Sequence, residues 1–252
     1  MTKNIDIVLS PALYPFQKKS GHTIVLIDVL RFTSTMTTAL ANGAVYAETF
    51  ADVDAALKAR SNDYSYKLVG EKGGAFIEGF NFNNSPVAMT HQNIGGRKLG
   101  FVTTNGTYMR SLMDNDQKIY AGCFLNGKAL INRLLEEDCD VQLVCSGCHN
   151  KPAVEDTLFA GMVADKLLKS NKYRYWEDVV PMCRMLYRTA KQDLKKYALR
   201  HSLVLRSRYN EYINYRDDLD FSFRQNIFDV VPEEEEPYKF VVNLNSEGLI
   251  FV

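Results

Sequence analysis

The chain has 252 residues, of which 46% are hydrophobic and 24% are charged, as is usual for a soluble globular protein. Its 30 Lys and Arg residues balance 30 Asp and Glu residues, so it lacks the basic excess typical of nucleic-acid-binding proteins. No apolar run is long enough to span a membrane, and the first residues have no apolar signal-peptide core. We expect a cytoplasmic protein without nucleic-acid or membrane partners.

Strands and helices alternate through the first two thirds of the chain. Strands are predicted at 5–9, 23–29, 45–50, 66–70, 98–103, 118–123 and 141–145. Helices are predicted at 33–41, 53–60, from 86 onward, and at 107–113, 127–137 and 154–169. This order predicts a layered α/β/α fold with a mainly parallel or mixed sheet. We expect one domain over 1–252, and the repeated units leave an internal duplication open.

The last third of the chain has a different composition. Residues 173–203 are rich in Lys, Arg and Tyr at helical spacing, which predicts a helix with a solvated face that wraps the sheet. Four consecutive glutamates at 233–236 predict an exposed loop. Residues 238–244 and 249–252 are predicted to pair as a closing hairpin around a turn at 245–248.

The five cysteines do not predict a disulfide framework, because their number is odd and the chain is large. Cys145 and Cys148 form a single C-x-x-C motif without a second ligand pair at zinc spacing. A redox pair is one interpretation of this motif. Two reduced, partly buried thiols are the simpler one.

Polar residues that could bind a ligand or take part in catalysis follow the predicted strands. In parallel α/β sheets, ligands bind at the carboxyl ends of the strands. The strand at 23–29 delivers Asp28, Arg31 and Thr33. Asp28 could ligate a hard cation, and Arg31 could hold a phosphate, sulfonate or carboxylate. A buried ion pair between Asp28 and Arg31, with Thr33 as a helix cap, is the structural alternative.

The strand at 66–70 leads into a long loop. Glycines flank Glu71 and Lys72, so backbone N–H groups can approach an anion closely. Glu78 is a candidate proton carrier in the same loop. Asn84 and Ser85 precede a proline-started helix and could cap it or hold a ligand oxygen. The length of the loop favours a functional role over an ordinary surface turn.

The strand at 98–103 is followed by the run Thr103, Thr104, Asn105, Gly106 and Thr107. Hydroxyl groups, a glycine and the free N–H groups of a helix start together predict a seat for an anion. The run lacks the lysine and the spacing of a nucleotide-binding P-loop. A capped turn from strand to helix is the alternative.

The strand at 141–145 delivers Ser146, Gly147 and the candidate proton carrier His149, and the next helix carries Glu155 and Asp156 in its first turn. The helix dipole favours acids at that position without any function. Together with Asp28 and Glu71, however, the two acids would form a carboxylate cluster that repels itself unless a cation holds it. Oxygen ligands of this kind suit Mg²⁺.

Two covalent phosphatase schemes lack their signatures. Neither Cys145 nor Cys148 has the arginine six residues later that a cysteine phosphatase needs, and Asp28 has no second acid two residues on. Phosphoester hydrolysis would therefore use a metal-activated water.

Several of these runs occur in an order that resembles the 2-phosphosulfolactate phosphatase family. The runs are Ile27–Arg31, Gly70–Gly74 with Glu78–Phe80, Asn84–Pro86, Thr103–Thr107, Ser146–Gly147 with Glu155–Asp156, and finally Asp218–Pro232. The resemblance covers nearly the whole chain. It implies a fold particular to the family and a Mg²⁺-dependent phosphatase that converts 2-phospho-3-sulfolactate to 3-sulfolactate and phosphate, a step toward coenzyme M.

The chain departs from the family pattern at a few positions. The family carries Asp in place of Asn81 and Gly in place of Asn83, and its segment after Ser146 is richer in glycine than residues 148–151. These departures motivate an alternative, a binding protein for small anions or phosphate esters that has lost hydrolysis. In either case the expected partner is a small phosphorylated or sulfonated acid, and a homo-oligomer is compatible with the sequence.

Overall fold

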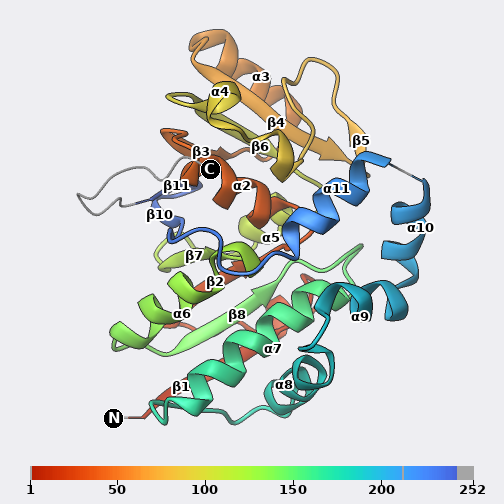
Figure 1. The fold of residues 1–252 in the computed structure, drawn as a ribbon. Helices are drawn as coiled ribbons and strands as arrows, with labels where there is room; N and C mark the ends of the chain where they lie inside the picture. The colour runs from red at the N-terminus through yellow and green to blue at the C-terminus, as the bar shows by residue number, and fades with distance from the viewer. Residues whose placement is uncertain (1, 212, 243–252) are drawn as a thin grey trace.

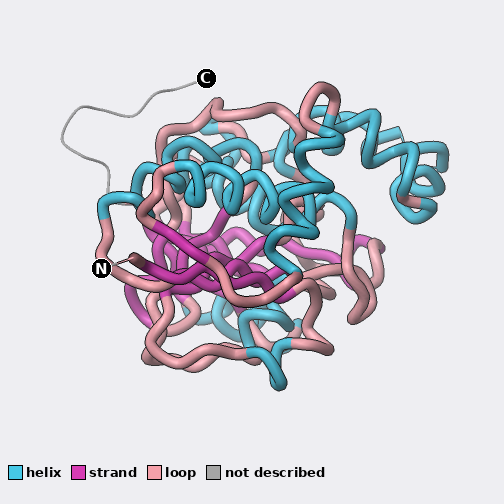
Figure 2. The backbone as a smooth tube through the Cα atoms, turned by 90° about the horizontal axis from the view of Figure 1, so that it is seen from below, coloured by secondary structure: helices cyan, strands magenta, loops and turns pink. Residues whose placement is uncertain are grey.

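The computed structural model describes residues 2–211 and 213–242. These residues form an α/β/α fold, with helices on both faces of an 11-stranded sheet (Figures 1 and 2). In spatial order the strands are β5 (Ala75–Phe76), β4 (Tyr66–Lys72), β6 (Lys98–Val102), β3 (Tyr46–Thr49), β11 (Lys239–Val241), β10 (Glu233–Glu236), β7 (Ile119–Gly122), β2 (Thr23–Ile27), β8 (Val141–Cys145), β1 (Lys3–Val8) and β9 (Tyr173–Arg174). The predicted fold class is confirmed.

The sheet consists of two parallel blocks that flank an antiparallel hairpin. One block contains β4, β6 and β3, and the other contains β7, β2, β8, β1 and β9. The hairpin β10–β11 joins them through antiparallel pairing with β7 and β3. The arrows of β4 and β8 both point toward the side of the molecule where the last helices lie (Figure 1).

The helices are α1 (Tyr14–Gln17), α2 (Phe32–Ala41), α3 (Val53–Asn62), α4 (His91–Ile94), α5 (Gly106–Ser111), α6 (Gly127–Glu136), α7 (Val154–Lys169), α8 (Val179–Ala190), α9 (Leu194–His201), α10 (Leu203–Glu211) and α11 (Ile213–Ser222), with 3₁₀ turns η1 (Pro86–Ala88) and η2 (Phe124–Asn126). Asp52 caps α3, accepting a hydrogen bond of 2.8 Å from Ala55 N. None of the helices in the described residues is long and apolar enough to cross a membrane.

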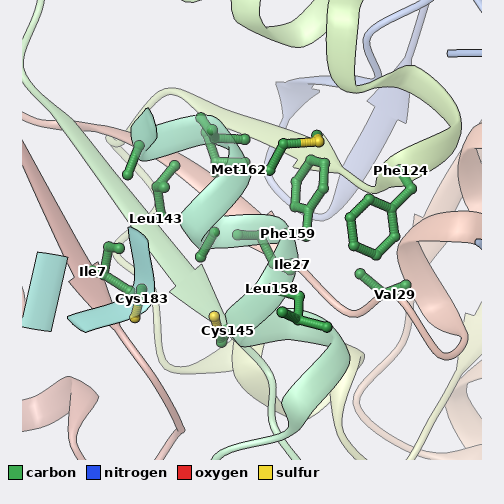
Figure 3. Close-up of a cluster of buried hydrophobic side chains, with 14 of the residues drawn as sticks. Ile7, Ile27, Val29, Phe124, Leu143, Cys145, Leu158, Phe159, Met162 and Cys183 are labelled. Atoms are coloured by element: carbon green, nitrogen blue, oxygen red, sulfur yellow. The ribbon is translucent and has the colours of Figure 1, made fainter. Parts of the chain in front are cut away.

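The central strand β2 is buried on both faces, because its side chains alternate between two hydrophobic clusters. Ile24 and Leu26 pack into a cluster that includes residues of α2, while Val25 and Ile27 pack into one that includes α7. Figure 3 shows the second cluster, where Phe159 of α7 lies among strand side chains. Burial of each such side chain contributes about 1.5–3 kcal/mol to folding.

The helix predicted from Pro86 onward is wrong. Only the 3₁₀ turn η1 forms there, and α4 follows as a separate short helix. The backbone leaves the helical region at Met89, where φ is −86° and ψ is 53°. The carbonyl oxygen of Met89 accepts a hydrogen bond of 2.7 Å from Asn42 Nδ2, so a tertiary contact replaces a helical one.

The prediction of helix over 173–203 is right for most of the segment, but the segment is interrupted. It begins as strand β9 and continues as α8 and α9, with a break at which Asp193 caps α9 through Lys196 N. Helix α8 packs closely on α7: a Cβ atom at Gly161 would lie 2.2 Å from the carbonyl oxygen of Cys183. This helix therefore forms an outer layer over α7.

The exposed loop predicted for the four glutamates is also wrong, because they form β10 in the middle of the sheet. Strand alternation turns Glu234 inward, where it makes a bidentate ion pair with the fully buried Arg110, both N···O distances being 2.5 Å. Glu233 instead pairs with Arg133 and Lys118. The four glutamates can therefore form a strand inside the sheet, because buried and half-buried cationic side chains pair with Glu233 and Glu234.

The predicted closing hairpin is partly supported. Residues 239–241 form β11, but this strand pairs with β10 and β3. The proposed turn at 245–248 and the strand at 249–252 lie outside the described residues.

We expect Glu234→Gln to lower the free energy of unfolding by about 3 kcal/mol, because it leaves the buried guanidinium of Arg110 without its anionic partner. Urea denaturation at neutral pH would measure this loss. The matched control is Glu235→Gln, an exposed neighbour, which should change stability by less than about 0.5 kcal/mol. Equal effects of the two changes would contradict the buried ion pair.

Candidate active site

A cavity lies where β2, β4 and β6 end, on the side of the molecule that α10 and α11 cover (Figure 1). Seven residues predicted from the sequence line it together: Asp28, Arg31, Glu71, Asn84, Thr104, Asn105 and His149. Leu30, Gly73, Gly74 and Arg208 complete the lining. Residues from four separate strand ends and one distant helix thus converge on one cavity.

Asp28 follows β2 directly and is buried at the floor of this cavity. One of its carboxylate oxygens accepts a hydrogen bond of 3.2 Å from Phe32 N at the start of α2. Thr33 fixes the same turn from below: its hydroxyl oxygen accepts from Asp28 N at 3.1 Å and lies 2.8 Å from the Asp28 carbonyl oxygen. Thr33, predicted as a substrate ligand, is buried here and does not line the cavity.

Arg31 is held by residues that are distant in the sequence. Its Nη1 donates to Asp218 of α11 at 2.5 Å, and its Nη2 donates to Asn83 at 3.3 Å. Asp218 is fully buried and also accepts from the hydroxyl of Ser85. The ion pair therefore forms with Asp218, and an Arg31–Asp28 pair is not the arrangement observed. Within the described residues these are the two side-chain hydrogen bonds of the guanidinium, which has five N–H groups.

Glu71 ties two of the strand ends together. Its carboxylate accepts from Thr104 N at 2.8 Å, from the Thr104 hydroxyl at 2.9 Å and from Gly74 N at 2.6 Å. The Thr104 hydroxyl in turn accepts from Gly73 N at 2.8 Å. The loop after β4 and the turn after β6 are thereby fixed side by side at the cavity.

The two acids that begin α7 have different positions. Both oxygens of Asp156 accept backbone hydrogen bonds of 2.9 Å, one from Val29 N and one from Gly147 N. Asp156 is outside the lining of this cavity and anchors α7 to the ends of β2 and β8. Glu155 is also buried, but it lines a second cavity that adjoins the first.

The other predicted site residues lie around this centre. Thr103 and Thr107 hydrogen-bond to each other across the turn before α5, and both are buried. Gly106 allows this turn to pack on Phe32, since a Cβ atom there would lie 2.3 Å from the Phe32 ring. These three residues support the turn from behind, and they do not line the cavity.

Asn84 and Ser146 are buried, and among the described residues neither Asn84 Oδ1 nor Ser146 Oγ has a hydrogen-bond partner. Asn84 lines the first cavity, so its oxygen is a candidate ligand or acceptor there. Lys72 and Glu78 are exposed and line neither of the two cavities. Gly147 lines the second cavity.

The family model for 2-phosphosulpholactate phosphatase matches residues 8–237. A probable 2-phosphosulfolactate phosphatase of Clostridium novyi is 32% identical over 237 residues, which cover 92% of this chain and 97% of the relative. Similar relatives with the same name occur in Clostridium acetobutylicum, 29% identical over 91% of this chain and 96% of the relative, and in Caldanaerobacter subterraneus, 30% identical over 83% and 86%.

The chain belongs to the 2-phosphosulfolactate phosphatase family. Asn81 and Asn83, two of the departures from the family pattern, have different positions. Asn81 accepts a hydrogen bond of 2.9 Å from Leu68 N and does not line the cavity, so it shapes the loop after β4. Asn83 contacts Arg31 and also accepts from Asn84 N at 2.7 Å. Its side chain therefore helps to orient the guanidinium.

The buried acids of this family member repel one another. Burial raises the pKa of Asp28 to about 7, and the charges of Glu71 and Glu155 add to the rise against the hydrogen bond from Phe32. Burial likewise raises the pKa of Glu155 to about 7. Burial, followed by the charges of Glu155 and Asp28, holds the pKa of Asp156 well above its usual range. A cation among these groups would relieve the repulsion.

The donor set fits Mg²⁺ bound with help from water and substrate. In the described part of the chain, no three Asp, Glu, His or Cys side chains already form a metal-holding group. Mg²⁺, however, commonly uses only one or two carboxylates together with waters and phosphate oxygens. Asp28 and Glu71 line the same cavity, and Asn84 adds an oxygen that no described residue hydrogen-bonds.

Two residues of the site were not predicted from the sequence. Asp218 binds Arg31, and Arg208 of α10 lines both cavities. Asp218 begins the last run of the family resemblance, which was a usable signal. Arg208 lies in a basic, tyrosine-containing segment with no local pattern that distinguishes it from a surface arginine.

The C-x-x-C motif is not a disulfide in this structure, since both cysteines are free. Cys145 is buried in the core cluster near Cys183 (Figure 3), and burial holds its pKa well above the usual range. Cys148 is half-buried in a tight turn with Lys151. A buried, protonated thiol is a poor redox nucleophile.

We expect Asp28→Asn to stabilise the protein in EDTA, increasingly so as the pH rises from 5 to 8. An acid whose pKa is higher in the folded state than in the unfolded state lowers the free energy of unfolding progressively as the pH rises. The loss builds up between the unfolded pKa, about 4, and the folded pKa, about 7. The amide removes that cost and keeps an oxygen for Phe32 N. Chemical denaturation should show a gain that grows by about 2–3 kcal/mol over this range.

The control for this change is Asp54→Asn, an exposed acid in the first turn of α3. It should show no comparable growth with pH. An Asp28→Asn protein whose stability relative to wild type is constant from pH 5 to 8 would contradict the buried acid cluster.

Proposed function

We propose that this protein is a cytoplasmic, Mg²⁺-dependent hydrolase of small 2-phosphooxy carboxylic acids. This class includes 2-phospho-3-sulfolactate, whose hydrolysis gives 3-sulfolactate and phosphate on the route to coenzyme M. Family membership supports the phosphatase activity. The observation that carries the proposal is one cavity in which buried carboxyl groups lie beside an oriented guanidinium.

The charges of this cavity support a role for a cation. Asp28 and Glu71 contribute carboxyl groups, while the positive charge of Arg31 is partly neutralised by Asp218. A phosphate dianion would be repelled by the carboxylates alone. Asp28, Glu71 and Glu155 would hold Mg²⁺, which when bound supplies charge neutralisation to the phosphoryl group. We give Asp156 an anchoring role, because it lines neither of the two cavities and both of its carboxylate oxygens accept backbone hydrogen bonds.

The chain's own residues bind and orient the ester. Arg31 donates to the phosphate oxygens, and Asp218 with Asn83 fixes the direction of its guanidinium. Thr104 and Asn105 face the same cavity from the turn before α5, and Asn84 offers a carbonyl oxygen. This arrangement fixes the phosphorus atom relative to the acid cluster.

Hydrolysis breaks the bond between phosphorus and the ester oxygen, adds a water oxygen to phosphorus and delivers one proton to the leaving alkoxide. His149 lines the cavity, and we propose it as the carrier of that proton. Glu78 is exposed and outside the lining, so this proposal gives it no role.

Phosphate release from 2-phospholactate and 2-phospho-3-sulfolactate tests the proposal. We expect release with Mg²⁺, little release in EDTA, and a loss of about 10²-fold or more in kcat/KM for Asp28→Ala, because the acid cluster then loses its central carboxylate. Asp54→Ala is the matched control and should retain activity.

Three outcomes would contradict parts of this account. Undiminished phosphate release in EDTA would contradict the metal dependence. An active Asp28→Ala enzyme would contradict the role of the acid cluster in hydrolysis. Tight binding of the esters without release from any of them would favour a binding protein that has lost hydrolysis.

A further inference from the structure

A second cavity of about 270 Å³ adjoins the proposed phosphate cavity. Leu30, Asn105 and Arg208 line both, so the two spaces meet along these residues. The second cavity lies between the start of α7, which supplies Val154 and Glu155, and the start of α10. A phosphoester whose phosphate occupies the first cavity would direct the rest of the molecule here.

The side chains of this second cavity are largely aliphatic. Leu30, Val154, Leu203, Val204 and Leu205 all line it. Leu203 is 75% exposed and Val204 is 44% exposed, although both belong to the lining. An apolar group bound in the cavity would remove these side chains from water, which is favourable.

The charges of the cavity do not favour a sulfonate. Arg208 is the only Arg or Lys in its described lining, so a sulfonate and a carboxylate bound here would have to share one guanidinium. The other basic group is the exposed His201. Arg208 lies at the junction of the two cavities, where it can bind the carboxylate that is bonded to the ester carbon.

We propose that the second cavity is a specificity pocket for an apolar substrate side chain. The preferred substrate is then a 2-phosphooxy carboxylic acid with a bulky aliphatic group in place of the sulfomethyl group. This inference rests on the proposed function, since it takes the first cavity as the phosphate site. Arg208 holds the carboxylate, and the aliphatic group covers Leu203 and Val204.

Two esters of nearly the same shape test the pocket. One is 2-phospho-3-sulfolactate, and the other is 2-phosphooxy-4,4-dimethylpentanoate, in which three methyl groups replace the three sulfonate oxygens. We expect the wild-type protein with Mg²⁺ to show a kcat/KM at least tenfold higher for the dimethylpentanoate ester. An equal or higher value for the sulfonate ester would overturn the inference.

A substitution in the second cavity tests whether the preference for the dimethylpentanoate ester arises there. Val204→Lys places a cation in the lining, at a partly exposed position that the fold tolerates. It should lower the preference for the dimethylpentanoate ester over the sulfonate ester about tenfold. The control is Val45→Lys, 53% exposed and outside both cavities, which should leave this preference unchanged. An unchanged preference in Val204→Lys would overturn the assignment of the side chain to this cavity.

Calorimetric binding of the same two esters separates this inference from the hydrolase proposal. If neither ester is hydrolysed, the proposed function fails, but the pocket is still tested by affinity. Tighter binding of the dimethylpentanoate ester, weakened in Val204→Lys, upholds the pocket. Tighter or equal binding of the sulfonate ester overturns it.

Discussion

Four acidic side chains are buried where the strands of a largely parallel sheet end, and their mutual repulsion constrains the whole site. Two of them are stabilised by the fold: Asp156 by backbone N–H groups of two strand ends, and Glu71 by Thr104 and Gly74. Burial nevertheless holds the pKa of Asp156 well above its usual range, and it raises the pKa of Asp28 and of Glu155 to about 7. The fold thus retains an unfavourable charge arrangement, which a bound cation would make favourable.

Helices α10 and α11, late in the chain, supply residues to a site whose other residues come from earlier strand ends. Arg31 follows the second strand, and its ionic partner Asp218 lies 187 residues later on α11. Arg208 reaches the same region from α10 and lines both cavities. Without these helices the guanidinium of Arg31 would have no buried partner, and the second cavity would have no outer wall. The helices α10 and α11 therefore contribute binding groups as well as cover.

Local chemistry explains which features the sequence could predict. The strand β8 and the helix α7 have the predicted bounds, because a short apolar run and a long amphipathic stretch have strong periodicity. The residues around the first cavity were found because they follow buried strands. Arg208, Asp218 and the strand β10 were not found, since their roles depend on partners far away in the chain. A run of four glutamates has no local signal for the buried arginine that it meets.

The most direct test of the acid cluster is the anomalous diffraction of crystals grown with Mn²⁺, a substitute for Mg²⁺, and inorganic phosphate. We expect a Mn²⁺ peak bonded to a carboxylate oxygen of Asp28 and shared with Glu71 or Glu155, with phosphate beside Arg31. A Mn²⁺ peak elsewhere, or none near these carboxylates at saturating Mn²⁺, would contradict it.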